Sequence, residues 1–121
     1  MALSFNEVGV IGSGQMGSGI AQVLATYGTK VKVFDVAEAQ LAKAKVGIEK
    51  SLQKLSEKGK LSSAPSDVLA RISFISKLED FAKSDLVIEA ATENLEVKRD
   101  LFKKLDQILG SNAIIGTNTS S

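Results

Sequence analysis

Residues 8–35 read VGVIGSGQMGSGIAQVLATYGTKVKVFD, and the order of residue types predicts a strand, a glycine turn, a helix and a second strand. The apolar, β-branched run at residues 8–11 is typical of a buried strand. Apolar residues then recur at helical spacing, and Gly28 fits the end of that helix. A second β-branched run ends in the carboxylate of Asp35. This stretch therefore predicts two parallel strands joined by a helix.

The turn at residues 12–17 spaces its glycines as Gly-x-Gly-x-x-Gly. In a dinucleotide-binding turn, a glycine at the position of Gly12 permits the tight bend out of the strand. One at the position of Gly14 lets the backbone approach a pyrophosphate, and one at Gly17 lets the helix pack closely on the strands. Because the turn follows a strand and opens a helix, we interpret it as such a site. The alternative is a tight structural turn with no ligand.

The two ends of this unit specify the ligand further. The backbone N–H groups of the first helical residues, Gln15 and Met16, are expected to point at the phosphates with the positive end of the helix dipole. Asp35 follows Gly12 by 23 positions (35 − 12), near the spacing that places a carboxylate on a ribose 2′-hydroxyl. A carboxylate there repels a 2′-phosphate, and residues 36–38 bring no arginine to receive one. The sequence therefore favours NAD over NADP.

Composition excludes several classes of function. The chain has 121 residues and a net charge of +1, which gives no overall attraction to nucleic acid or to an anionic membrane. It has no cysteine, which excludes disulfides and thiolate zinc sites, and we expect no metal. No apolar run approaches the roughly 20 residues that span a bilayer. Residues 1–6 leave no room for a signal peptide before the first strand, so a cytoplasmic protein is expected.

The rest of the chain alternates helices and strands. A helix of about 20 residues after the second strand has one apolar face, made of Leu41, Ala44, Ile48, Leu52 and Leu55. Further strands are expected at residues 72–75, 86–90 and 113–116, and further helical segments at 65–69, 78–82 and 97–108. Alternating strands and helices form a parallel sheet with right-handed crossovers. We predict one Rossmann-type α/β domain, with strand order 3-2-1-4-5 and a long helical excursion after strand 2.

Ligands of such sheets bind at the carboxyl ends of the strands, where the strand order reverses. In this chain that rule selects residues 12–17, Asp35, residues 90–94 and residues 117–121. We therefore expect the functional site at this edge, over the crevice between the first and fourth strands.

Several blocks of sequence resemble one enzyme family, in family order and over essentially the whole chain. They are VIGSGQMGSGIAQ at 10–22, KGKL at 58–61, LVIEA at 86–90, ENLEVK at 93–98 and TNTSS at 117–121. The chain resembles the N-terminal NAD-binding domain of the L-3-hydroxyacyl-CoA dehydrogenases, including the short bacterial 3-hydroxybutyryl-CoA dehydrogenases. Many dehydrogenases share the glycine turn, whereas the ENLEVK and NTSS blocks are far more specific.

The resemblance implies hydride transfer between an L-3-hydroxyacyl-CoA and NAD, in fatty acid and butanoate metabolism such as β-oxidation. It places Asp35 on the adenosine ribose, and Ala90, Glu93 and Lys98 near the dinucleotide. Glu93 has a second interpretation, because a carboxylate suits the first turn of the helix that follows. Lys98 is then its solvated partner.

The resemblance also implies two residues at the reacting centre. It places Asn118 close to the nicotinamide and Ser120 beside the substrate oxygen. A neutral amide and a hydroxyl can orient the reacting C–O group without carrying charge. The alternative is that residues 117–121 form a polar terminus without a catalytic role.

The same resemblance implies that the long helix contacts coenzyme A. Ser51 and Lys58 match family positions that hold coenzyme A, whose phosphates attract ammonium groups. Lysines on an exposed helix face are more often only solvated, which is the alternative here.

In this family the catalytic base is a histidine, oriented by a glutamate, in a stretch that follows the TNTSS block. The chain contains no histidine. The resemblance therefore implies that residues 1–121 are an incomplete NAD-binding domain, without the sixth strand and the helical C-terminal domain that forms the homodimer. We expect such a chain to bind NAD weakly and to lack appreciable dehydrogenase activity. Its fifth strand would be an open sheet edge with Ile114 and Ile115, which predicts self-association.

Two other functions fit the same residues. One is a non-catalytic NAD-binding module. The other is a different NAD-linked dehydrogenase of the same fold, such as a sugar-acid or 2-hydroxyacid dehydrogenase; the NTSS block and the long basic helix argue against it.

Overall fold

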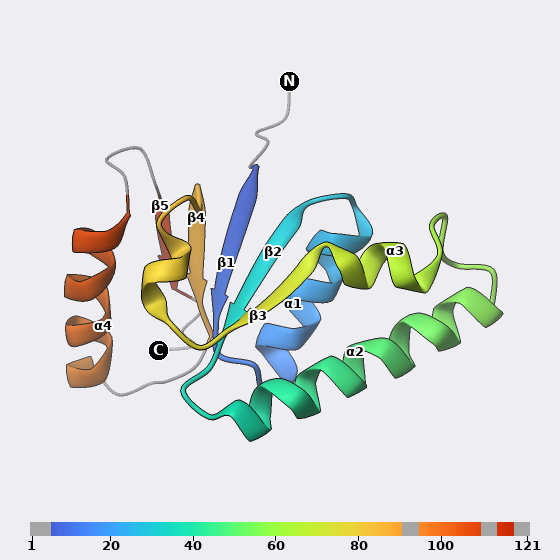
Figure 1. Ribbon diagram of the computed structural model, residues 1–121, viewed down its shortest axis with the longest axis horizontal. Helices are drawn as coiled ribbons and strands as arrows, with labels where there is room; N and C mark the ends of the chain where they lie inside the picture. Colours follow the sequence, from blue (N-terminus) through green and yellow to red (C-terminus); the bar gives the residue numbers. More distant parts are fainter. Residues whose placement is uncertain (1–5, 91–94, 110–113, 118–121) are drawn as a thin grey trace.

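The computed structural model describes residues 6–90, 95–109 and 114–117. The elements, in chain order, are β1 (Glu7–Ile11), α1 (Gln15–Thr26), β2 (Lys30–Phe34), α2 (Glu38–Glu57), α3 (Pro65–Ala70), β3 (Ile72–Ile75), the 3₁₀ helix η1 (Leu78–Phe81), β4 (Leu86–Glu89), α4 (Leu95–Ile108) and β5 (Ile114–Thr117). The five strands form one parallel sheet in the order β3-β2-β1-β4-β5 (Figure 1). Both the predicted fold class and the predicted strand order are confirmed. No helix of the described part is long and apolar enough to cross a membrane.

The strand register brings three carboxyl ends to the same level. Ile11 at the end of β1 is paired with Phe34 of β2 on one side and with Glu89 of β4 on the other. The residues that follow these strands therefore emerge together, at the point where the strand order reverses. Backbone hydrogen bonds extend the alignment: the N–H of Gly12 donates to Phe34 O at 2.8 Å, and the N–H of Ala90 donates to Ile11 O at 2.9 Å.

Each face of the sheet has its own hydrophobic core. On one face, α1, α2 and α3 cover a cluster built around buried Val10, Val33, Ile48 and Leu52. On the other face, η1 and α4 supply Phe81 and Leu105 to a second cluster. Figure 1 shows this three-layer arrangement, with α4 and η1 on one side of the strands and the other helices on the opposite side. The layers hold the carboxyl ends of the strands in a fixed position.

The helix α1 is confirmed, but its most deeply buried residues are small, and of its large apolar residues Ile20 and Leu24 are only partly buried against the core. Its buried residues are the small Gly17, Ala21 and Ala25. The residues whose spacing indicates the helix include Met16, Val23 and Tyr27, which are 55%, 56% and 85% exposed. Small side chains let α1 lie close to the strands, and this close approach leaves the larger ones at the margin and in solvent.

A second close approach joins β1 to η1 on the opposite face. A Cβ atom built on Gly9 would lie 2.5 Å and 2.6 Å from ring atoms of Phe81, and that ring is fully buried. Gly9 therefore leaves room for the Phe81 ring to lie on the middle of β1. By contrast, Gly19 of α1 is exposed and its Cβ direction is open, so of these two helix glycines only Gly17 permits the close approach to the sheet.

Candidate functional site

The glycine turn between β1 and α1 has the backbone geometry that its sequence predicts. Gly12 has a φ of 103°, in the left-handed region that side-chain-bearing residues rarely adopt. A Cβ atom on Gly17 would lie only 1.8 Å from the carbonyl oxygen of Gly12. Gly12 and Gly17 are thus required by the turn itself, whether or not a ligand binds.

Gly14 differs from these two glycines. A Cβ atom on Gly14 would meet no protein atom within 4 Å, and Gly14 is exposed at the N-cap of α1. No packing contact explains a glycine there, whereas the approach of an outside group to the backbone does. The first turn of α1, which lies wholly in the described part, carries no acidic residue, so the positive end of its dipole is not offset by a carboxylate of its own. Gln15 and Met16 are exposed at the same end.

Asp35 follows β2 directly and is fastened to the glycine turn. Its Oδ2 accepts hydrogen bonds from the Ser13 hydroxyl at 2.8 Å and from the Ser13 N–H at 3.1 Å. Its Oδ1 accepts from the N–H of Ala37 at 3.0 Å. Burial raises the pKa of the carboxyl, but these donors and the N–H of Val36 outweigh burial and hold the pKa below the ordinary value of 3.8. Asp35 is therefore an ionised acceptor at neutral pH, 22 residues from Ser13 in sequence yet bonded to it.

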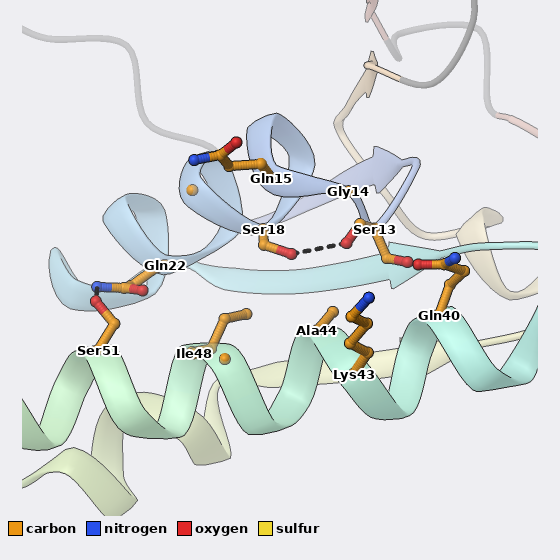
Figure 2. A pocket seen from close by; sticks show the side chains of 12 residues that line it. Ser13, Gly14, Gln15, Ser18, Gln22, Gln40, Lys43, Ala44, Ile48 and Ser51 are labelled. Atoms are coloured by element: carbon orange, nitrogen blue, oxygen red, sulfur yellow. Dashed lines mark hydrogen bonds between the residues drawn. The ribbon is translucent and has the colours of Figure 1, made fainter.

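A groove of about 510 Å³ adjoins the turn and runs between α1 and α2. Figure 2 shows Gln22 of α1 facing Ser51 of α2, with the Gln22 amide nitrogen donating to the Ser51 hydroxyl at 2.9 Å. Nearer the turn, Ser18 donates to the carbonyl oxygen of Ser13 at 2.8 Å, and Lys43 reaches into the same space from α2 (Figure 2). The groove thus combines hydroxyls, amides and one ammonium group beside the N-terminus of α1.

Of the two residues expected to contact coenzyme A, Ser51 lines this groove and Lys58 does not. Ser51 is half-buried and lines this groove. Lys58 is exposed at the C-cap of α2, about two helical turns further along, and does not line the groove. Gln22 and Lys43 also line the groove, although their sequence spacing gives no sign of it, because the groove arises only when α1 and α2 pack together.

The end of β4 brings two residues to the carboxyl edge of the sheet: Ala90, which was expected there, and Glu89, which was not. Ala90 lies beside the end of β1, as its backbone hydrogen bond shows. Glu89, which sequence analysis did not assign, is only 1% exposed there. Glu93, Asn118 and Ser120 lie outside the described residues, as does the side chain of Lys98.

Comparison with known proteins decides the family. The sequence pattern of the family described as "3-hydroxyacyl-CoA dehydrogenase, NAD binding domain" matches residues 7–121. The chain belongs to this family. A Deinococcus radiodurans protein named "Probable 3-hydroxybutyryl-CoA dehydrogenase" is 56% identical over 115 residues, which cover 95% of this chain and 41% of that protein. Human mitochondrial hydroxyacyl-coenzyme A dehydrogenase is 45% identical over 122 residues, covering 95% of this chain and 39% of the human protein.

Solved structures support the same assignment for this NAD-binding domain. The (S)-3-hydroxybutyryl-CoA dehydrogenase of Ralstonia eutropha superposes with a TM-score of 0.91 at 42% identity, over 98% of this chain and 42% of that one. The 3-hydroxybutyryl-CoA dehydrogenase of Escherichia coli K12 gives a TM-score of 0.94 at 40% identity, over 98% and 25%. The chain therefore spans about two-fifths or less of these relatives' lengths. The resemblance read from the sequence blocks is confirmed, and NAD is the cofactor of the family to which the chain belongs.

Proposed function

We propose that this chain is the cofactor-binding part of an enzyme that transfers a hydride between an L-3-hydroxyacyl-CoA and NAD. The observation that carries the proposal is the ionised Asp35, bonded to the glycine turn at the point where the strand order reverses. An acceptor there suits a ribose hydroxyl and disfavours a 2′-phosphate. The open space at Gly14 and the N-terminus of α1 suit a pyrophosphate. When bound, NAD supplies the hydride acceptor or donor.

The roles of the remaining site residues rest on the family resemblance. In this proposal Ala90, Glu93 and Lys98 lie along the dinucleotide. Asn118 and Ser120 orient the reacting groups of nicotinamide and substrate. Both are uncharged hydrogen-bonding groups, which is the chemistry needed to hold a C–O group during hydride transfer.

The groove between α1 and α2 supports a contact with the coenzyme A part of the substrate. Ser51 offers a hydroxyl from the groove wall, and Lys43 adds a positive charge that phosphates attract. Lys58 belongs to the same proposal as an exposed cation further along α2. The proposed function has four further parts. A histidine outside this chain acts as the catalytic base, and a C-terminal domain forms the homodimer. The enzyme is cytoplasmic and serves β-oxidation.

A domain exchange tests the activity. The chain replaces the matching domain of the Ralstonia eutropha dehydrogenase, to which it is similar over 98% of its length. We expect the hybrid to oxidise NADH with acetoacetyl-CoA and to show no comparable rate with free keto acids. The 121-residue chain alone is the matched control, and we expect it to bind NADH without turnover. A hybrid that folds and binds NADH but prefers free keto acids would contradict the proposed substrate class. Turnover by the isolated chain would contradict the proposal that catalysis needs a histidine outside this chain.

A further inference from the structure

The side chain of Ser13, which lies between the first two glycines of the turn, makes a specific contact with Asp35. Its hydroxyl donates to Asp35 Oδ2 at 2.8 Å, and its N–H donates to the same oxygen at 3.1 Å. Ser13 is only 4% exposed. A buried hydroxyl needs a hydrogen-bond partner, and this carboxylate provides one.

The Ser13 hydroxyl also differs in kind from the other donors to Asp35, which are backbone N–H groups. Ala37 reaches the other carboxylate oxygen through its backbone N–H, at 3.0 Å, as any residue with an N–H could. Within the described residues, the Ser13 hydroxyl is the only side-chain group that donates to Asp35. It is the one donor to this carboxylate that a substitution can remove without altering the backbone.

The geometry suggests what the hydroxyl does. Ser13 is buried while Asp35 is partly exposed, so the hydroxyl holds the carboxylate from the protein side and leaves the exposed side for a ligand. The terminal torsion of an aspartate is soft. One backbone N–H group reaches each oxygen of Asp35, and the Ser13 hydroxyl adds the shortest of these bonds, at 2.8 Å, so it restricts the carboxylate further. Holding it before the ligand arrives removes part of the entropy cost of binding.

We propose that Ser13 is a positioning residue that fixes the Asp35 carboxylate for the hydroxyls of the adenosine ribose. This inference rests on the proposed function, because it assumes that the ribose binds at Asp35. It adds a specificity role for the residue that lies between two of the fingerprint glycines. Ser13 acts through Asp35, whereas the glycines act through the shape of the turn.

The test measures how strongly binding depends on the ribose hydroxyl. The full chain and its Ser13→Ala variant are titrated with NADH and with the NADH analogue that lacks the adenosine 2′-hydroxyl, following nicotinamide fluorescence. We expect Ser13→Ala to weaken NADH binding about three- to tenfold, because a donor to an ionised acceptor is lost. The same substitution should weaken binding of the analogue much less. The dissociation constant of the analogue divided by that of NADH should therefore fall at least about threefold in Ser13→Ala.

Ser18→Ala is the matched control. It removes a hydroxyl from the same turn, but that hydroxyl donates to the Ser13 carbonyl oxygen and not to Asp35. Any general loosening of the turn should weaken both ligands equally and leave the ratio unchanged. If Ser13→Ala does not fold, Ser13→Cys takes its place with the same expectation, since the thiol keeps similar volume and is a weak donor.

The outcomes separate the inference from the proposed function. NADH binding by Ser13→Ala with the wild-type ratio would overturn the role of Ser13 and leave the proposed function intact. A wild-type chain that binds NADH equally well with and without the 2′-hydroxyl would overturn the ribose contact and the role of Ser13 with it. Absence of NADH binding by the wild type would overturn both proposals.

Discussion

Replacing Gly17 with alanine tests the packing of the glycine turn, and Gly19→Ala on the same helix is its matched control. The alanine Cβ at position 17 would lie 1.8 Å from the carbonyl oxygen and 2.9 Å from the carbonyl carbon of Gly12. Ordinary contacts begin at 3.4 Å, so the turn and the helix must separate by about 1.6 Å (3.4 − 1.8) to restore one. The obstacle is backbone at a residue with a φ of 103°, which cannot move aside like the end of a side chain. At position 19 the same methyl group meets nothing within 4 Å.

These contacts set the expected magnitudes. Overpacking costs about 1–3 kcal/mol, and alanine in place of glycine in a helix returns about 0.5–1 kcal/mol. Because the obstacle at position 17 is backbone, we take the upper end of the overpacking range and expect Gly17→Ala to lower the free energy of unfolding by about 2–2.5 kcal/mol (3 − 1 to 3 − 0.5). We expect Gly19→Ala to raise it by up to about 1 kcal/mol. Urea denaturation followed by circular dichroism measures both, with the slope of the transition showing whether the unfolded state has changed. The reasoning would be refuted if Gly17→Ala were as stable as Gly19→Ala.

Three further predictions follow from other contacts. Gly9→Ala should lower the free energy of unfolding by about 1–3 kcal/mol, because the buried Phe81 ring occupies the Cβ position. In urea denaturation, the double variant with Phe81→Leu should show a coupling energy between the two sites, and additive losses would contradict this account. The folded-state pKa of Asp35 lies below its ordinary value, so its contribution to stability is complete above about pH 5 and is lost as the pH falls through the folded-state pKa. The stability difference between wild type and Asp35→Asn should therefore be constant near neutral pH and narrow below about pH 4, and a difference that grows on acidification would contradict the lowered pKa. Because β5 is an edge strand of the described sheet, the chain should self-associate in sedimentation velocity experiments as its concentration rises, and a clean monomer at high concentration would contradict this.

Much of the fold is encoded locally, which is why the sequence predicts it. The glycine spacing at residues 12–17 and the β-branched runs on either side indicate the first βαβ unit without any tertiary information. The long helix α2 is equally clear, since Leu41, Ala44, Ile48 and Leu52 all lie on one face and are buried. The right-handed crossover rule then leaves few possible orders for the strands.

Contacts between distant segments are what the sequence does not show. The helix α1 buries Gly17, Ala21 and Ala25 because it lies so close to the sheet, and a hydrophobicity pattern cannot register that distance. The contacts of Gly9 with Phe81 and of Ser13 with Asp35 depend on sheet register across 72 and 22 residues (81 − 9 and 35 − 13). The sequence identified Asp35 but gave no sign of the hydroxyl that holds it.

The direct test of the central claim is a paired titration of the chain with NADH and NADPH, followed by nicotinamide fluorescence. An ionised Asp35 held by the glycine turn should accept a ribose hydroxyl and repel a phosphate at the same place. We predict that NADH binds at least about tenfold more tightly than NADPH, a difference of about 1.4 kcal/mol. NADPH binding as tightly as NADH would contradict the account.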